Sequence, residues 1–154
     1  MDKLLAGVER ININPPIGIK RPGIRLFADP IQSIESDLTA TALVLEHNDT
    51  KIAIIACDLA FIPIEDDKKW RGIIGKEIGS NRSHIMINCS HTHSGPAFPS
   101  WIEENPEQMR LQEEYQDNLF NKLKNVVKSA NENLAQCRIG ADFGHAVIGM
   151  YRRE

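Results

Sequence analysis

The stretch Ile52–Cys57 (IAIIAC), followed directly by Asp58, decides the fold predicted for this sequence. It is apolar at every position, whereas a strand with one solvated face alternates apolar and polar residues. It therefore predicts a strand covered on both faces, inside a layered α/β domain. A second β-rich run, Leu38–Leu45, precedes it across a short connection that contains Asn48 and Asp49, so the two runs predict a hairpin.

Further elements are predicted on either side of this hairpin. Apolar residues at helical spacing after an acidic first turn indicate one helix, and a longer amphipathic pattern indicates a second. Short apolar runs between polar turns indicate strands. The predicted elements are a strand at Leu4–Ile13, a helix at Pro63–Ile78, a strand at His84–Cys89, a helix at Glu107–Leu134 and a last strand at Cys137–Phe143. Their order favours an α/β fold, with helices packed on a mixed β-sheet.

Composition limits the classes of function. A chain of 154 residues that is 42% hydrophobic and 25% charged is expected to form one soluble globular domain over residues 1–154. A net charge of −3 argues against a nucleic-acid partner. Three cysteines without CxxC spacing favour a reducing compartment, and neither a signal peptide nor a transmembrane segment is recognisable. The expected location is the cytoplasm.

The polar cluster Ser90–Pro96 (SHTHSGP) follows the predicted strand that ends at Cys89. In an extended backbone, residues i and i+2 point to the same side, so His91 and His93 could converge on one metal ion or one substrate group. The ends of strands in α/β sheets commonly carry ligand sites. Two surface histidines on a turn explain the same pattern, and the spacing alone does not decide between these interpretations.

Several segments resemble the neutral/alkaline, non-lysosomal ceramidase family, in the same order along the chain. Residues 6–18 (AGVERININPPIG) resemble its opening strand and turn, Cys57–Leu59 its acid-terminated central strand, and Ser90–Pro96 its signature motif. Arg138–Gly140 and Tyr151–Arg153 resemble the stretch leading to its Asn-Arg-Arg element, although Tyr151 stands where asparagine is usual. The resemblance implies that this chain is an N-terminal part of a catalytic domain.

The family's chemistry implies roles for individual residues. His91 is expected to be a Zn2+ ligand, and His93 and Arg152 to line the reaction centre and contact the substrate or its developing oxyanion. Zinc would activate a water molecule to hydrolyse a lipid-like N-acylated small molecule, releasing a fatty acid and a sphingoid base. Ser90 and Ser94 are then expected to support the site rather than attack the substrate, because neither lies in a GxSxG context. Asp58 could orient a histidine or could end its strand as a turn or cap residue.

The predicted zinc site is incomplete, because a catalytic zinc usually has three protein ligands. In the family the others, a histidine, a glutamate and a tyrosine, follow the arginine pair, which indicates a fragment whose missing C-terminal part would complete the site. Asp58, His84 or His145 could instead act as substitute ligands, although no spacing brings them together. Trp101 could line an apolar substrate entrance or pack against the domain.

The sequence therefore supports a zinc-dependent amidase first. A catalytically silent fragment or binding domain is the alternative, and a hydrolase with a dinuclear metal centre is a third possibility that would need more acidic ligands. If the sheet packs against an absent segment, we expect exposed apolar surface and self-association.

Overall fold

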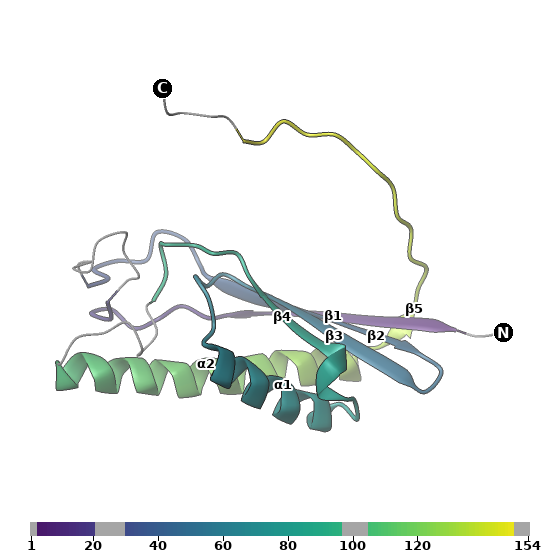
Figure 1. Cartoon of the computed structure of the whole chain (residues 1–154), viewed down its shortest axis with the longest axis horizontal. Helices are drawn as coiled ribbons and strands as arrows, with labels where there is room; N and C mark the ends of the chain where they lie inside the picture. Colours follow the sequence, from purple (N-terminus) through teal and green to yellow (C-terminus); the bar gives the residue numbers. More distant parts are fainter. Residues whose placement is uncertain (1–2, 21–29, 97–104, 150–154) are drawn as a thin grey trace.

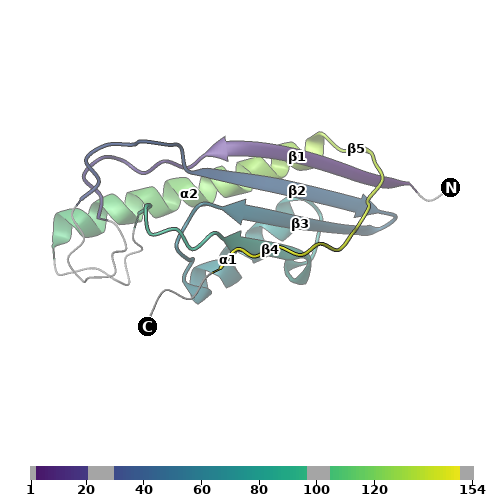
Figure 2. The same cartoon turned by 90° about the horizontal axis from the view of Figure 1, so that it is seen from above.

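A computed structural model describes residues 3–20, 30–96 and 105–149 of the chain. Its centre is a mixed sheet of five strands in the order β4-β3-β2-β1-β5 (Figures 1 and 2). The pairs β1–β2, β1–β5 and β2–β3 are antiparallel, whereas β4 lies parallel to β3. The strands span Leu4–Asn12 (β1), Thr39–His47 (β2), Thr50–Cys57 (β3), Ile85–Cys89 (β4) and Ala135–Gln136 (β5). The α/β fold with a mixed sheet is confirmed.

The predicted hairpin is present as β2 and β3, joined by a turn at Asn48 and Asp49. Asn48 has a φ of 52°, in the left-handed region that asparagine tolerates better than most residues. This turn sets the register in which Leu43 pairs with Ile54. The chain crosses from β3 to the parallel strand β4 through helix α1 and a short 3-10 turn at Arg82–His84, so His84 precedes the strand that it was predicted to begin.

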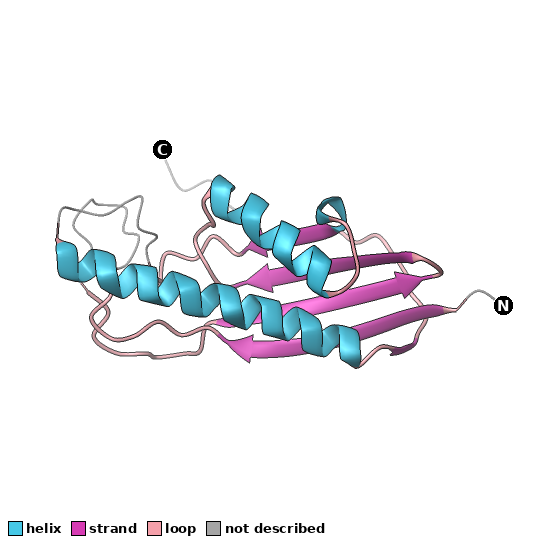
Figure 3. Cartoon of the chain, turned by 90° about the horizontal axis from the view of Figure 1, so that it is seen from below, coloured by secondary structure: helices cyan, strands magenta, loops and turns pink. Residues whose placement is uncertain are grey.

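Two helices, α1 (Ile64–Glu77) and α2 (Pro106–Glu132), cover the same face of the sheet (Figures 1 and 3). Both were predicted to within a few residues. Asn105 caps α2 by accepting a hydrogen bond from the Glu107 backbone N–H, at 3.0 Å. The helices meet where the rings of Trp70 and Phe120 lie 5.5 Å apart. The core lies between helices and sheet, and its largest fully buried side chains include Ile55, Ile74, Ile85, Leu119 and Leu123.

Helix α2 lies close against strand β1 at Gly7. A Cβ atom built on Gly7 would lie 1.8 Å from the carbonyl oxygen of Ala130. Glycine is therefore needed at this position, because any side chain would have to displace the helix backbone.

The opposite face of the sheet is open, and this differs from the prediction for β3. Ile55 and Cys57 are buried under the helices, but the alternate residues Ile54 and Ala56 are exposed. Within the described part of the chain, no helix or strand lies on this face. The prediction of a strand covered on both faces is thus wrong for these residues, because an apolar sequence shows what could be buried but not what is present to bury it.

The prediction of a last strand at Cys137–Phe143 is also wrong. Pairing ends with the two residues of β5 and one further hydrogen bond, from the Cys137 backbone N–H to the Leu4 carbonyl oxygen at 3.0 Å. Residues 138–149 then run without regular structure above the open face (Figures 1 and 2). Phe143 and Val147 are fully exposed, and no described strand pairs with this segment. None of the described helices is long and apolar enough to span a membrane.

Candidate functional site

The cluster Ser90–Pro96 lies beside Asp58, because β3 and β4 are parallel and end at the same edge of the sheet. Two backbone hydrogen bonds continue the pairing beyond the strands: Ser90 N–H to the Cys57 carbonyl oxygen at 3.0 Å, and His91 N–H to the Leu59 carbonyl oxygen at 2.9 Å. These bonds fix the start of the histidine segment against the end of β3. The prediction that the cluster lies at the end of a strand is confirmed.

One ring nitrogen of His91 is hydrogen-bonded, and the other has no hydrogen-bond partner among residues 3–20, 30–96 and 105–149. Its Nδ1 lies 2.9 Å from the carbonyl oxygen of Ala60. A carbonyl only accepts hydrogen bonds, so Nδ1 carries the proton and the lone pair of the neutral ring is on Nε2. Histidine ligands of metals are commonly oriented in this way, by donating the second ring N–H to a backbone carbonyl. The contact therefore orients His91 as a ligand with Nε2 as the donor atom.

His93 lies close to His91, although the backbone between them is not the extended strand that the sequence predicted. Strand β4 ends at Cys89, and His91 has a φ of 61°, which turns the backbone sharply. The two rings nevertheless face each other edge to face, with centroids 5.1 Å apart and planes 74° apart. Both residues are exposed, so a ligand can reach either ring. A left-handed histidine is unusual, and such strained positions are enriched at functional sites.

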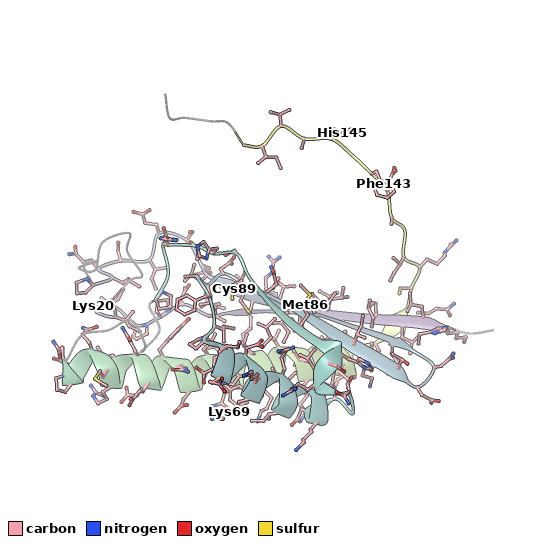
Figure 4. The ribbon with its side chains drawn as sticks, in the orientation of Figure 1. Lys20, Lys69, Met86, Cys89, Phe143 and His145 are labelled. Carbon is pink, nitrogen blue, oxygen red and sulfur yellow. The ribbon has the colours of Figure 1, made fainter. Side chains whose placement is uncertain are left out.

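The residues proposed as substitute ligands do not join this pair. No three histidine, cysteine, aspartate or glutamate side chains gather into a metal-binding group within residues 3–20, 30–96 and 105–149. His84 precedes β4, at the opposite end of that strand from His91, and His145 lies on the C-terminal segment, far from the sheet (Figure 4). The described residues therefore fit zinc at one oriented imidazole with a second nearby, and they do not form a complete site.

Asp58 stabilises the backbone rather than a histidine. Its Oδ2 accepts hydrogen bonds from the backbone N–H and the hydroxyl of Thr39, both at 2.9 Å. These bonds tie the end of β3 to the start of β2. Of the two predicted roles for Asp58, the structure supports that of a strand-end residue.

Ser90 and Ser94 flank the two histidines in the sequence. The Ser94 backbone N–H donates to Thr92 Oγ1 at 3.2 Å, which closes a local turn. Ser90 and Asp58 help to line a cavity of about 230 Å3 on the open side of the sheet, together with Arg10 and Asn88. Arg152 and Trp101 lie outside the described residues.

A larger cavity, of about 530 Å3, was missed by sequence reasoning. It lies between residues 30–36 and the histidine segment, where Thr92 and Ser94 reach its wall. Most of its polar groups are uncharged, with Glu35 as the one acidic residue among those that line it. No motif marks residues 30–36, so only the polar composition near Pro30 could have suggested a binding loop.

Cys57 and Cys89 pair directly across β3 and β4, on the face covered by helices. Burial raises the pKa of Cys57 to about 12 and that of Cys89 to about 11. The thiolate, and not the thiol, is the nucleophile. With these raised pKa values both cysteines are protonated, and therefore inert, at neutral pH. We therefore assign both cysteines a packing role beside the histidine segment and no role in catalysis.

Neither a protein-family model nor a curated protein matches this chain in sequence. Solved structures do match it. The neutral ceramidase from Pseudomonas aeruginosa superposes with a TM-score of 0.68 at 15% identity, and a second structure, a ceramidase complexed with C2, superposes with a TM-score of 0.69 at 16% identity. In each case the match covers 88% of this chain but 22% of the other. The chain therefore has the fold of one part of the neutral ceramidases, as its sequence motifs predicted.

Proposed function

We propose that this chain is part of a zinc-dependent amidase that cleaves the N-acyl bond of a ceramide-like lipid, yielding a fatty acid and a sphingoid base. The observation that carries the proposal is the orientation of His91. Its Nδ1 is bound to the Ala60 carbonyl oxygen, its Nε2 is available, and the His93 ring lies 5.1 Å away. The fold shared with neutral ceramidases supports the same assignment.

Each residue has a distinct proposed role. His91 would hold the zinc ion through Nε2, and the ion would supply a water molecule of lowered pKa and polarise the amide carbonyl. His93 would donate a hydrogen bond to the oxyanion that develops on the carbonyl oxygen, together with Arg152. Asp58, Ser90 and Ser94 would keep the histidine segment in place. Asp58 would do so through its bond to Thr39, and Ser94 through its bond to Thr92.

The remaining zinc ligands would come from polypeptide other than the described residues. A catalytic zinc site needs about three protein ligands, and the described part of the chain offers no group of three. The chain spans 22% of the ceramidase chains that it matches, so a further segment of such a domain is the proposed partner. Cytoplasmic location is proposed as well, from the three unpaired cysteines of the chain.

The alternative is a catalytically silent fragment or binding domain. The incomplete ligand set favours it, because no three potential ligands gather within the described part of the chain. The two functions differ in whether zinc changes the rate of amide cleavage.

A hydrolysis assay separates them. Release of fatty acid from a fluorescent N-acylsphingosine would be measured with added zinc, for this chain alone and for this chain joined to the further segment that supplies the remaining ligands, as wild type, His91→Ala and His47→Ala. His47 is an exposed histidine at the opposite end of the sheet and serves as the matched control. We expect no release by the chain alone, and zinc-dependent release by the joined protein that is lost in His91→Ala and kept in His47→Ala. If the joined wild type releases no fatty acid at any zinc concentration, the amidase proposal fails and the silent fragment stands.

A further inference from the structure

Strand β2 begins at Thr39, and its neighbour across the ladder is Asp58, the residue that follows β3. A hydrogen-bonded pair in an antiparallel ladder exchanges two backbone bonds. Here one bond is of this kind, from the Asp58 N–H to the Thr39 carbonyl oxygen at 2.9 Å. The Thr39 N–H and hydroxyl donate instead to Asp58 Oδ2, both at 2.9 Å. The carboxylate therefore takes the place of the backbone carbonyl, which leaves the chain free to turn away from the sheet.

The chain turns directly after β3. The Leu59 N–H donates back to the Cys57 carbonyl oxygen at 3.0 Å, which closes a tight turn. The next two carbonyl groups both accept hydrogen bonds from His91: that of Leu59 from the backbone N–H and that of Ala60 from the ring Nδ1–H, each at 2.9 Å. One short corner, residues 58–60, therefore holds both the backbone and the ring of the histidine.

Both bonds matter for His91, because its backbone conformation is unfavourable. Its φ of 61° lies in the left-handed region, which brings a Cβ atom too close to the following carbonyl oxygen. Such a conformation persists only where the surrounding structure imposes it. If the two acceptors of the corner shift, the backbone of His91 is free to return to negative φ, and its ring turns away from the position in which Nε2 faces a ligand.

The corner is fastened on two sides. Leu59 is fully buried and Ala60 is 4% exposed, so the core anchors one side of the corner. The side facing β2 is held through the two bonds that Thr39 donates to the Asp58 carboxylate. Hydrogen bonds to a carboxylate are stronger than bonds between neutral groups, so this contact fixes the direction in which the corner leaves β3.

We infer that Thr39 is a positioning residue for His91. Its N–H and hydroxyl hold the Asp58 carboxylate, the carboxylate holds the corner, and the corner holds the histidine. The orientation of a metal ligand that follows β4 is thus set in part by the first residue of β2, two strands away in the sheet. This inference rests on the proposed role of His91 as a zinc ligand.

The test compares variants of Thr39 with a matched control on the same strand. Thr39→Val removes the hydroxyl but keeps the shape of the side chain and the backbone N–H. Thr39→Ser keeps the hydroxyl, and Asp58→Ala removes the acceptor. Thr41→Val is the control, because Thr41 lies two residues further along the same face of β2 and its hydroxyl accepts from Arg10 instead. Circular dichroism and urea denaturation check that each variant folds.

The first readout is the ring of His91 without metal. Two-bond proton–nitrogen correlations by NMR, at about pH 8 where free imidazole is neutral, show which ring nitrogen carries the proton. The wild type, Thr39→Ser and Thr41→Val should show the Nδ1–H form. Thr39→Val should show a mixture with the Nε2–H form, and Asp58→Ala a larger share of it.

The second readout is zinc affinity. A group that bonds a metal ligand directly is worth about 10- to 100-fold in affinity. Thr39 and Asp58 act through the corner, so we expect smaller losses, of about threefold in Thr39→Val and about tenfold in Asp58→Ala. Thr39→Ser and Thr41→Val should bind zinc as the wild type does.

Three results would overturn the inference. A wild-type ring without the Nδ1–H form shows that the bond to Ala60 is absent. Unchanged ring forms in Thr39→Val and Asp58→Ala show that the corner is held without Thr39. An equal shift in Thr41→Val shows a general loosening of β2.

The two proposals fail separately. A chain that binds no zinc, but whose His91 ring form depends on Thr39, supports the positioning role and counts against the zinc ligand. If Asp58→Ala does not fold, the comparison of Thr39→Val with Thr41→Val still decides.

Discussion

The two faces of the sheet are built from similar residues, but helices cover only one of them. Ile54 and Ile55 are neighbours in β3, yet Ile55 is fully buried under the helices and Ile54 is 36% exposed. The same amino acid therefore contributes to the folded chain on one face and remains available for association on the other. Apolar sequence sets how much of a strand can be buried, and the neighbouring elements set how much is buried.

The largest expected effect is on the covered face, at Gly7. Gly7→Ala should destabilise the chain by about 4 kcal/mol or more, because the new Cβ atom would meet the Ala130 carbonyl oxygen at 1.8 Å and backbone would have to move. Urea denaturation followed by circular dichroism measures the loss. Val8→Ala, one residue away on the open face, should cost less than about 1 kcal/mol, and equal losses would contradict the assigned packing of β1 on α2.

The neighbouring isoleucines give a smaller and more direct comparison. Ile55→Ala should lower the free energy of unfolding by about 3 kcal/mol, because it leaves a cavity in the core. Ile54→Ala should lower it by about 1 kcal/mol when measured at low protein concentration, where association is minimal. Similar values for the two variants would show that both faces are covered, as the sequence alone predicted.

The smallest effect concerns pH and the two buried thiols. Burial raises the pKa values of Cys57 and Cys89 from 9.0 to about 12 and about 11, so the unfolded chain loses these protons first as the pH rises. The stability that the protonated thiols contribute is complete below pH 9 and is lost as the pH rises toward 11–12. By pH 10 the loss should be about 1.4 kcal/mol for each thiol.

Urea denaturation at pH 7.5 and pH 10 measures this loss. A Cys57→Ala/Cys89→Ala variant should show a shallower decline between the two pH values than the wild type, and Cys137→Ala should behave as the wild type does. Identical declines in all three proteins would show that the buried thiols do not control stability in this range.

The elements of the fold were largely predictable, since their signals are local. Helix α2 repeats apolar residues every three or four positions, and β2 and β3 flank a turn that contains Asn48. The two errors, at β3 and at Cys137–Phe143, concern contacts between distant segments. Apolar residues such as Phe143 indicate a strand only if a partner strand is present, and sequence does not say whether it is.

The candidate site was predictable in its residues but not in its geometry. The motif around His91 and His93 placed both at a strand end, and the structure agrees. The hydrogen bond to Ala60 and the positive φ of His91 depend on how the end of β3 meets the segment after β4, so no local pattern encodes them. Asp58 was assigned two possible roles, and the structure supports the one through Thr39.

The measurement that tests the account most directly is zinc affinity by competition with a chromophoric chelator, on protein without a histidine tag. Because the described residues supply one oriented imidazole and a second nearby, the account predicts weak binding of about one zinc ion per chain, with affinity reduced at least about tenfold in His91→Ala and unchanged in His47→Ala. Equal zinc affinity in the two variants would contradict the assignment of His91 as a metal ligand.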